Sequence, residues 1–209
     1  PAWLSDVLVQ HVDEFAKYPP NPGAPELLET CAAWLNRRYG LDFGTDRVIA
    51  LNGTREGLFN ASIALCPERK AGQKPVILIP NPFYQVYMVA ALTVRADIVF
   101  VPATAESGFL PDFEALPKDI LERTAIAYIC SPSNPQGAVA DAGYWTTLFA
   151  LAERFDFRVF ADECYAEIYR ATPPPGAFEL AAAASVDPER VLAFHSLSKR
   201  SNLPRLRSG

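Results

Sequence analysis

The chain has 209 residues, half of them hydrophobic and 21% charged, and its 19 basic and 24 acidic residues give a net charge of −5. This composition is typical of a globular protein with a full core, and the acidic balance argues against nucleic acid as a partner. No stretch approaches the roughly 20 apolar residues of a membrane span, and the first residues lack the basic-then-apolar pattern of a secretion signal. The four cysteines are widely spaced without a C-x-x-C pair, so we expect reduced thiols in a cytoplasmic protein, with neither a zinc site nor a disulfide scaffold.

The apolar pattern alternates between helical segments and short strands. Residues 25–39 have the apolar spacing of a helix, which Gly40 would end. Further helical patterns occur at 55–65, 84–93, 143–155 and 177–184, and the proline-rich stretch 173–175 is typical of a surface loop. Short apolar runs predict strands at 47–51, 76–80, 97–102, 125–130, 158–161 and 191–195. Near-continuous apolar strands that alternate with helices predict an α/β fold, with a mostly parallel sheet sandwiched by helices.

A residue of chemical interest follows five of these six runs. In chain order these residues are Gly53, Tyr84, Asn134, Asp162 and Lys199. Ligands of open α/β sheets gather at the carboxyl ends of the strands, and all five positions fall on that edge. The sequence therefore predicts one shared site rather than five unrelated positions.

Lys199 is the most informative of these residues. It follows Ser196 and Ser198, and Arg207 comes eight residues later. A lysine between small hydroxyl residues, with a spaced arginine, suits a phosphorylated aldehyde cofactor, because the amine can attach to the aldehyde while the hydroxyls and the guanidinium hold the phosphate. Most lysines are solvated surface charges, so the interpretation depends on the groups upstream.

The upstream groups fit a pyridine ring. Asp162 could hold the proton on a ring nitrogen, although a turn or helix cap is the commoner role of an aspartate after a strand. Tyr165 and Asn134 could bind a phenolic oxygen from its two sides, although core packing and a turn are their ordinary roles. Tyr84 could stack on the ring, with an ordinary core aromatic as the alternative.

The segment from Gly53 to Gly57 lies between a predicted strand and a predicted helix. Backbone N–H groups at a helix N-terminus favour a phosphate dianion, and glycine permits its close approach. No Gly-Lys-Ser/Thr follows, so the segment is not a P-loop. Together these groups indicate pyridoxal 5'-phosphate (PLP) as the cofactor.

The chain resembles the fold-type I, class I/II PLP-dependent aminotransferases from Tyr18 to Gly209. The matching motifs are Lys17-Tyr18-Pro19-Pro20, Gly53-Thr54-Arg55-Glu56, Asn81-Pro82-Phe83-Tyr84, Asn134-Pro135-Gln136-Gly137, Ala161-Asp162-Glu163-Cys164-Tyr165 and Ser196-Leu197-Ser198-Lys199. A narrower likeness, in the stretches NPFYQVY, DECYAEIY and SLSKRSNLP, is to the N-succinyldiaminopimelate aminotransferases of bacterial lysine biosynthesis.

The resemblance implies a role for each residue of the site. Lys199, Asp162 and Tyr165 would be catalytic, with Lys199 forming the Schiff base and transferring protons. The remaining cofactor-binding residues would be Gly53, Thr54, Arg55, Tyr84, Asn134, Ser196, Ser198 and Arg207, and Tyr18 would reach the phosphate of a neighbouring subunit.

The resemblance also implies the organisation and the reaction. Residues 1–24 would form a segment that reaches the partner of a homodimer, and residues 25–209 a PLP-binding large domain. The family's small C-terminal domain, with its arginine for the substrate α-carboxylate, is absent from these residues, so we expect the isolated chain not to transaminate. The expected substrates are glutamate and a 2-oxo acid, N-succinyl-2-amino-6-oxopimelate. Arg205 stands where the family usually has glycine, and it would strain its loop if the position required a positive φ or close packing.

Two other functions are compatible with these motifs. A PLP-dependent lyase, such as a C–S lyase, shares the cofactor cradle. An aminotransferase-like ligand-binding module, as in regulators that fuse this fold to a DNA-binding segment, would share the fold without the activity. No basic helix-turn-helix pattern occurs in the chain.

Overall fold

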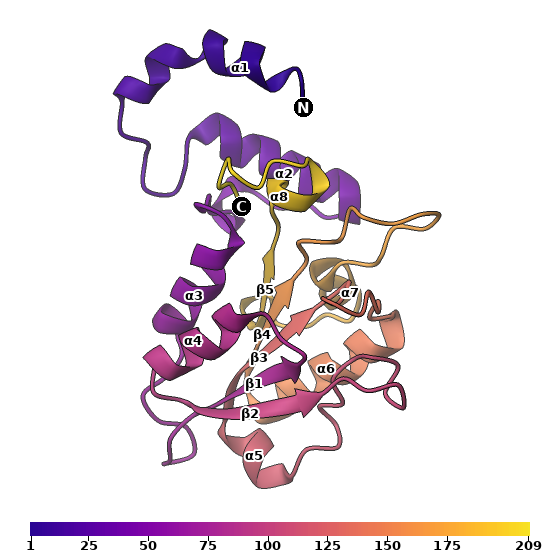
Figure 1. Ribbon diagram of the computed structural model, residues 1–209. Coiled ribbons are helices and arrows are strands. Elements are labelled where there is room, and N and C mark those ends of the chain that lie inside the picture. The colour runs from indigo at the N-terminus through magenta and orange to yellow at the C-terminus, as the bar shows by residue number, and fades with distance from the viewer.

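A computed structural model describes all 209 residues and contains one sheet of five parallel strands (Figure 1). The spatial order is β2-β1-β3-β4-β5. The strands are β1 (Val76–Asn81), β2 (Asp97–Pro102), β3 (Thr124–Cys130), β4 (Arg158–Asp162) and β5 (Val191–Phe194). The predicted parallel α/β architecture is confirmed.

Helices cover both faces of the sheet, as a parallel sheet requires. One face carries α3 (Thr54–Leu65) and α4 (Gln85–Thr93), and the other carries α5 (Lys118–Arg123), α6 (Ala142–Phe155) and α7 (Ala177–Ala183) (Figure 1). At the end where β4 and β5 finish lie α2 (Pro25–Tyr39) and the short α8 (Leu197–Arg200). The predicted helices at 25–39, 55–65, 84–93, 143–155 and 177–184 are present within a residue or so at each end.

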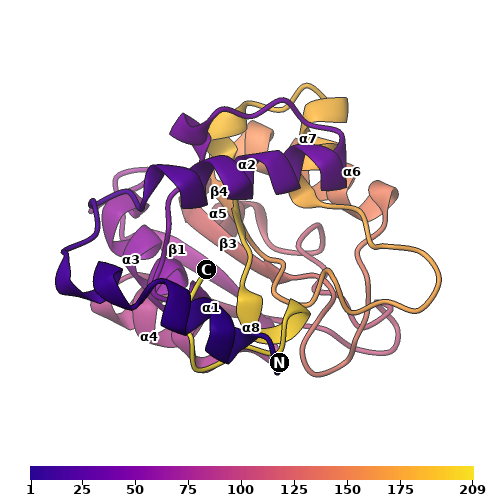
Figure 2. The ribbon, with the colours of Figure 1, turned by 90° about the horizontal axis from the view of Figure 1, so that it is seen from above.

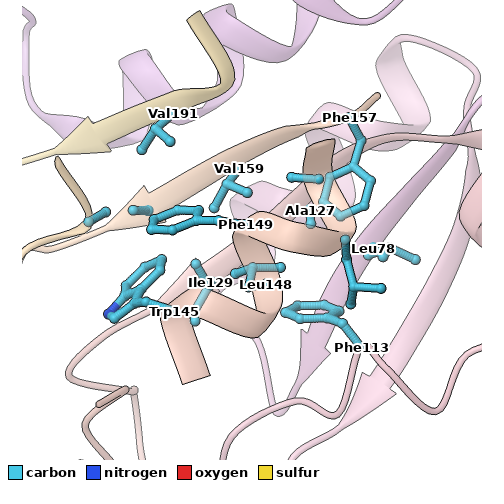
Figure 3. Close-up of a cluster of buried hydrophobic side chains, with 14 of the residues drawn as sticks. Leu78, Phe113, Ala127, Ile129, Trp145, Leu148, Phe149, Phe157, Val159 and Val191 are labelled. Atoms are coloured by element: carbon cyan, nitrogen blue, oxygen red, sulfur yellow. The ribbon is translucent and has the colours of Figure 1, made fainter. Parts of the chain in front are cut away.

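The strands are buried on both faces, and alternate residues feed two separate cores. All seven residues of β3 are buried. Ala127 and Ile129 point into the larger core with Trp145 and Phe149 of α6, where those two rings stack 5.4 Å apart (Figure 3). Residues of the opposite parity, such as Ile126 and Tyr128, pack against α3 and α4. This two-sided burial explains why the strand sequences are apolar throughout rather than alternating.

The N-terminal segment lies apart from the sheet, beyond α2 (Figures 1 and 2). It contains α1 (Leu4–Gln10) and the 3₁₀ helix η1 (Val12–Ala16), and neither has a buried residue. Large apolar side chains of the segment are exposed, namely Trp3, Val7, Leu8, Val9, Val12, Phe15 and Tyr18. None of the helices is long and apolar enough to cross a bilayer.

The predicted strand at 47–51 is wrong. Its first residue closes the 3₁₀ helix η2 (Thr45–Arg47), and the rest is extended backbone that joins no strand of the sheet. Ala50 N donates to Pro22 O, and Leu51 exchanges two backbone hydrogen bonds with Gly209, at 2.8 and 3.0 Å. The apolar run therefore reflects packing of Leu51 near α3 and the sheet, not a strand ladder. The sequence analysis predicted none of α1, η1, η2, α5, α8 and the 3₁₀ helix η3 (Pro188–Arg190), while 173–175 does form a loop.

Candidate active site

The carboxyl ends of the strands surround a cavity of about 590 Å³. Nine of the residues predicted for the site line it, which are Thr54, Arg55, Tyr84, Asn134, Asp162, Tyr165, Ser198, Lys199 and Arg207. Gly53 and Ser196 lie just behind the lining, next to Thr54 and Ser198, and Tyr18 is fully exposed elsewhere. The lining also includes Tyr87, Cys130, Cys164 and Pro204, for which the sequence predicted no role.

Asp162 is the last residue of β4 and is only 5% exposed. The Tyr87 hydroxyl donates to its Oδ2 at 2.6 Å, and the Cys164 N–H donates to Oδ1 at 3.3 Å. Burial raises the pKa of the Asp162 carboxyl, and these hydrogen bonds only partly oppose that rise. A buried carboxylate at a cavity wall is stabilised when a cationic N–H binds it, so Asp162 fits the protonated nitrogen of a pyridine ring.

Tyr87 is held rigidly on α4 by its surroundings. Its ring stacks on Tyr128 at 4.4 Å with the planes 16° apart, and the Tyr128 hydroxyl donates to Leu58 O at 2.8 Å. Burial raises the pKa of Tyr87 well above its usual value, so the phenol stays protonated and can only donate to the carboxylate. The sequence contained a signal that Tyr87 lies at the site, since it comes three residues after Tyr84 and so lies near the same face of a helix.

Lys199 lies on α8, and its Nζ is 5.6 Å from the centroid of the Tyr165 ring. The Ser196 hydroxyl caps this helix by accepting from Ser198 N at 3.0 Å, and it lies 2.9 Å from Ser208 O. The serines on either side of Leu197 therefore fix the turn that aims Lys199 at the cavity. Ser198 also presents its own side chain to the cavity.

The N-terminus of α3 and Arg207 together form an anion cradle. Gly53, with φ 88°, precedes the helix, and a Cβ placed on it would lie 2.1 Å from Nη2 of Arg207. The guanidinium thus lies against the first turn of α3, held by donation from Nη1 to Pro204 O at 2.9 Å. Free backbone N–H groups of a helix end beside a guanidinium suit a phosphate group. Neither condition for strain at Arg205 is met, because its side chain is exposed and its φ is not positive, whereas Arg207 has φ 54°.

Arg55 and Tyr84 form a pair at the cavity wall. Arg55 Nε donates to the Tyr84 hydroxyl at 2.8 Å, which leaves the terminal nitrogens of the guanidinium available. Two further arginines near this end of the sheet, Arg170 and Arg200, do not line the cavity. Arg200 lies over the ring of Trp34, 4.4 Å from its centroid.

Asn134 and Tyr165 occupy the loops that follow β3 and β4. Asn134 is exposed in its turn, and its side chain makes no hydrogen bond within the protein. Burial raises the pKa of the Tyr165 hydroxyl, which keeps it a hydrogen-bond donor. Both groups therefore have donors available toward the cavity, as the sequence-based prediction requires.

The fold and this set of side chains define an aminotransferase-type PLP domain. The family model for aminotransferase class I and II matches residues 5–209, and the chain belongs to this family, as predicted from its motifs. The family is PLP-dependent, and the buried Asp162, the lysine on α8 and the anion cradle fit that cofactor.

Individual relatives agree on the fold and differ in name. The LL-diaminopimelate aminotransferase of Moorella thermoacetica is 34% identical over 219 residues, covering all of this chain and 52% of its own length. A crystal structure of an aminotransferase from Neisseria meningitidis is 39% identical with a TM-score of 0.93, covering the whole chain and 53% of that protein. A probable N-succinyldiaminopimelate aminotransferase from Thermus thermophilus is 30% identical with a TM-score of 0.76, over 87% of this chain and 47% of its own. The chain thus spans about half the length of the relatives it matches.

Proposed function

We propose that the protein is a PLP-dependent aminotransferase that moves an amino group between glutamate and a 2-oxo acid with the diaminopimelate skeleton. The observation that carries the proposal is the shared cavity, where Lys199, Asp162 and the anion cradle lie on one edge of the sheet. Family membership and the names of the relatives support the reaction class. The activity belongs to the whole protein, and residues 25–209 supply its PLP-binding domain.

Asp162 holds the ring proton in this reaction. When bound, PLP supplies an aldehyde for amine attachment and a protonated ring that stabilises negative charge at the substrate Cα. The Asp162 carboxylate keeps the proton on the ring nitrogen, and Tyr87 fixes the carboxylate from its other oxygen. Tyr165 and Asn134 would donate to the phenolic oxygen, and Tyr84 would pack against the ring.

Lys199 has two tasks. Its Nζ would hold the cofactor covalently, and the same amine, when free, would move a proton at the substrate Cα. The serine cap of α8 fixes the direction from which the amine approaches. The phosphate would be held by the N–H groups at Gly53 and Thr54, by Ser196 and Ser198, and by Arg207.

Residues 1–24 reach a second subunit in this proposal. Their apolar side chains are exposed, and Tyr18 is far from any internal partner. A homodimer in which Tyr18 reaches the neighbouring phosphate would bury this segment. Oligomeric state by light scattering, with and without residues 1–24, tests this arrangement.

The two candidate substrates are distinguished by the succinyl group on the amine far from the reacting end. Relatives of similar identity are named for LL-diaminopimelate and for its N-succinyl form. The stretches NPFYQVY and DECYAEIY favour the N-succinyl substrate, which is our proposal. The two substrates share their reacting end and differ only at the distal end.

The test is a donor comparison with the purified full-length protein and PLP. N-succinyl-LL-diaminopimelate and LL-diaminopimelate are each supplied with 2-oxoglutarate, and glutamate formation is measured. We expect turnover with the N-succinyl donor and much less with the free one. The opposite order would replace the substrate but keep the reaction class, whereas release of homocysteine, pyruvate and ammonia from cystathionine without glutamate formation would indicate a lyase.

A further inference from the structure

A second buried carboxylate lies directly behind the proposed site. Glu163 follows Asp162, and its side chain is 2% exposed. Its Oε2 accepts from the Tyr39 hydroxyl at 3.2 Å, and its Oε1 accepts from Ala177 N at 2.6 Å, at the start of α7. Nε2 of His195 lies 3.1 Å from Oε2. None of these residues lines the cavity.

The cluster stands where two strands separate. β4 and β5 remain paired up to Asp162 and Phe194, and the last backbone bond runs from Glu163 N to Phe194 O at 3.0 Å. Beyond that bond one branch continues to Tyr165 and the other to Lys199. Glu163 and His195 are the first residues of the two branches, so their contact joins the branches at the point where the ladder ends.

Helix α2 supports both branches from outside. The Trp34 ring meets His195 edge-on at 5.3 Å, and Tyr39 lies 5.9 Å from the same ring. Arg200, which follows Lys199, lies over Trp34. The residues that flank the Lys199 turn, His195 and Arg200, therefore contact α2 and Glu163 rather than the sheet.

Electrostatics distinguish Glu163 from an ordinary buried side chain. A nearby cation, Arg38, lies over the Tyr39 ring but pairs with Glu167 at 2.8 Å and donates to Pro174 O. His195 Nε2 is buried and has no aligned hydrogen bond, although it is within ion-pair distance of Glu163. Burying a carboxylate is costly, and an apolar side chain often serves stability as well or better. The Glu163 carboxylate contacts α2, the start of α7 and the residue that follows β5. Contacts with three separate elements indicate that the carboxylate orients these elements relative to one another.

We propose that Glu163 is a positioning residue, which acts through His195 to hold the Lys199 turn against the Asp162 turn. This inference rests on the proposed function, because it assigns Glu163 a role in the same PLP site. Glu163 touches neither cofactor nor substrate. Its effect reaches the cavity through the backbone of Asp162, its own neighbour in the chain, and of Ser196, the neighbour of His195.

The test measures PLP affinity in Glu163→Ala, Glu163→Gln and the matched control Glu167→Ala. Fluorescence titrations are made below the melting temperature of each apoprotein. We expect Glu163→Ala to weaken PLP binding about tenfold, the scale seen when an outer support of a site is removed. Glu163→Gln, which can still accept from Ala177 N, should restore part of the affinity. Glu167→Ala breaks the Arg38 pair and should leave the affinity unchanged.

A double-mutant cycle with Lys199→Ala separates positioning from general loosening. If Glu163 acts by placing Lys199, the Glu163→Ala penalty on PLP affinity shrinks when the lysine is absent. An equal penalty in both backgrounds, or a lowered melting temperature with unchanged affinity, would overturn the inference. If Glu163→Ala does not fold, His195→Gln is expected to give the same pattern, and wild-type affinity in it would also overturn the inference. Failure of the wild-type protein to bind PLP would instead refute the proposed function.

Discussion

The Tyr87 hydroxyl donates to Asp162 Oδ2 at 2.6 Å, across 75 positions of sequence. Both groups are buried, and the Tyr128 ring holds Tyr87 in place. One oxygen of the carboxylate is thus already satisfied by the protein, and Asp162 is oriented toward the cavity before any cofactor binds. A preoriented acceptor avoids the cost of reorganisation on binding.

Tyr87→Phe should destabilise the apoprotein. The substitution keeps the stack on Tyr128 but removes the only side-chain hydroxyl that donates to the buried carboxylate. A hydrogen bond to a charged group contributes about 1.5–3 kcal/mol, and a loss of that order should appear in urea denaturation. Tyr84→Phe, which loses a hydroxyl bonded to Arg55 at the cavity wall, is the control and should change stability little. Equal stability of Tyr87→Phe and wild type would contradict the role.

Asp162→Asn should change the pH dependence of stability. Burial raises the folded pKa of Asp162 above the unfolded value of about 3.9, so its contribution to stability is fully present below that value and is lost as pH rises through the folded pKa. The neutral amide does not titrate. Without PLP, the melting temperature of Asp162→Asn relative to wild type should therefore improve as the pH rises from about 4 toward neutrality.

Addition of PLP near neutral pH should reverse the change in the melting temperature of Asp162→Asn relative to wild type. The wild type gains stability from the pairing of Asp162 with the ring nitrogen, whereas Asp162→Asn retains the cofactor but loses most turnover, because an amide does not hold the ring proton. Differential scanning fluorimetry across pH, with and without PLP, measures both effects. A melting-temperature difference that is independent of pH and of PLP would contradict the assignment.

Most of the site followed from the sequence because parallel strands place their carboxyl ends on one edge. Tyr84, Asn134, Asp162 and Lys199 each come after an apolar run, and chain direction alone brings them together. The motif resemblance then gave each residue a role. That rule needs only the strand positions, not their order in the sheet.

The sequence did not predict the supports of the site. Tyr87 and Glu163 act through contacts 75 and 124 positions away, and an apolar period cannot distinguish them from core or surface residues. The run 47–51 failed for a related reason, because a strand needs a neighbour in the ladder as well as apolar side chains. In this chain Leu51 pairs only with Gly209. Long-range partners, rather than local preference, decide such positions.

Lys199 is predicted to be the residue that carries the cofactor covalently. It is the only lysine that lines the cavity. Borohydride reduction of the PLP-loaded protein, followed by peptide mapping, should place the label on Lys199, and Lys199→Ala should abolish the visible absorption band of the imine while leaving the fold largely intact. A label on Lys17, Lys70, Lys74 or Lys118 would contradict the assignment.

Gly53→Ala should damage the anion cradle specifically. Gly53 has φ 88° and ψ 151°, a region open essentially to glycine, so the substitution should cost about 1–3 kcal/mol in the apoprotein. Its Cβ would lie 2.1 Å from Nη2 of Arg207, and the guanidinium must move away from the α3 N-terminus. PLP affinity should fall, whereas affinity for pyridoxal, which lacks the phosphate, should stay unchanged.

Gly57→Ala is the matched control for this change. It makes the same substitution four residues later on α3, where the new Cβ meets Leu51 and Phe194 instead of Arg207. That variant should lose stability through core crowding and bind PLP and pyridoxal as the wild type does. Isothermal titration of both ligands against both variants separates the outcomes. If Gly53→Ala lost affinity equally for PLP and pyridoxal, the cradle formed by the α3 N-terminus and Arg207 would not be the phosphate site.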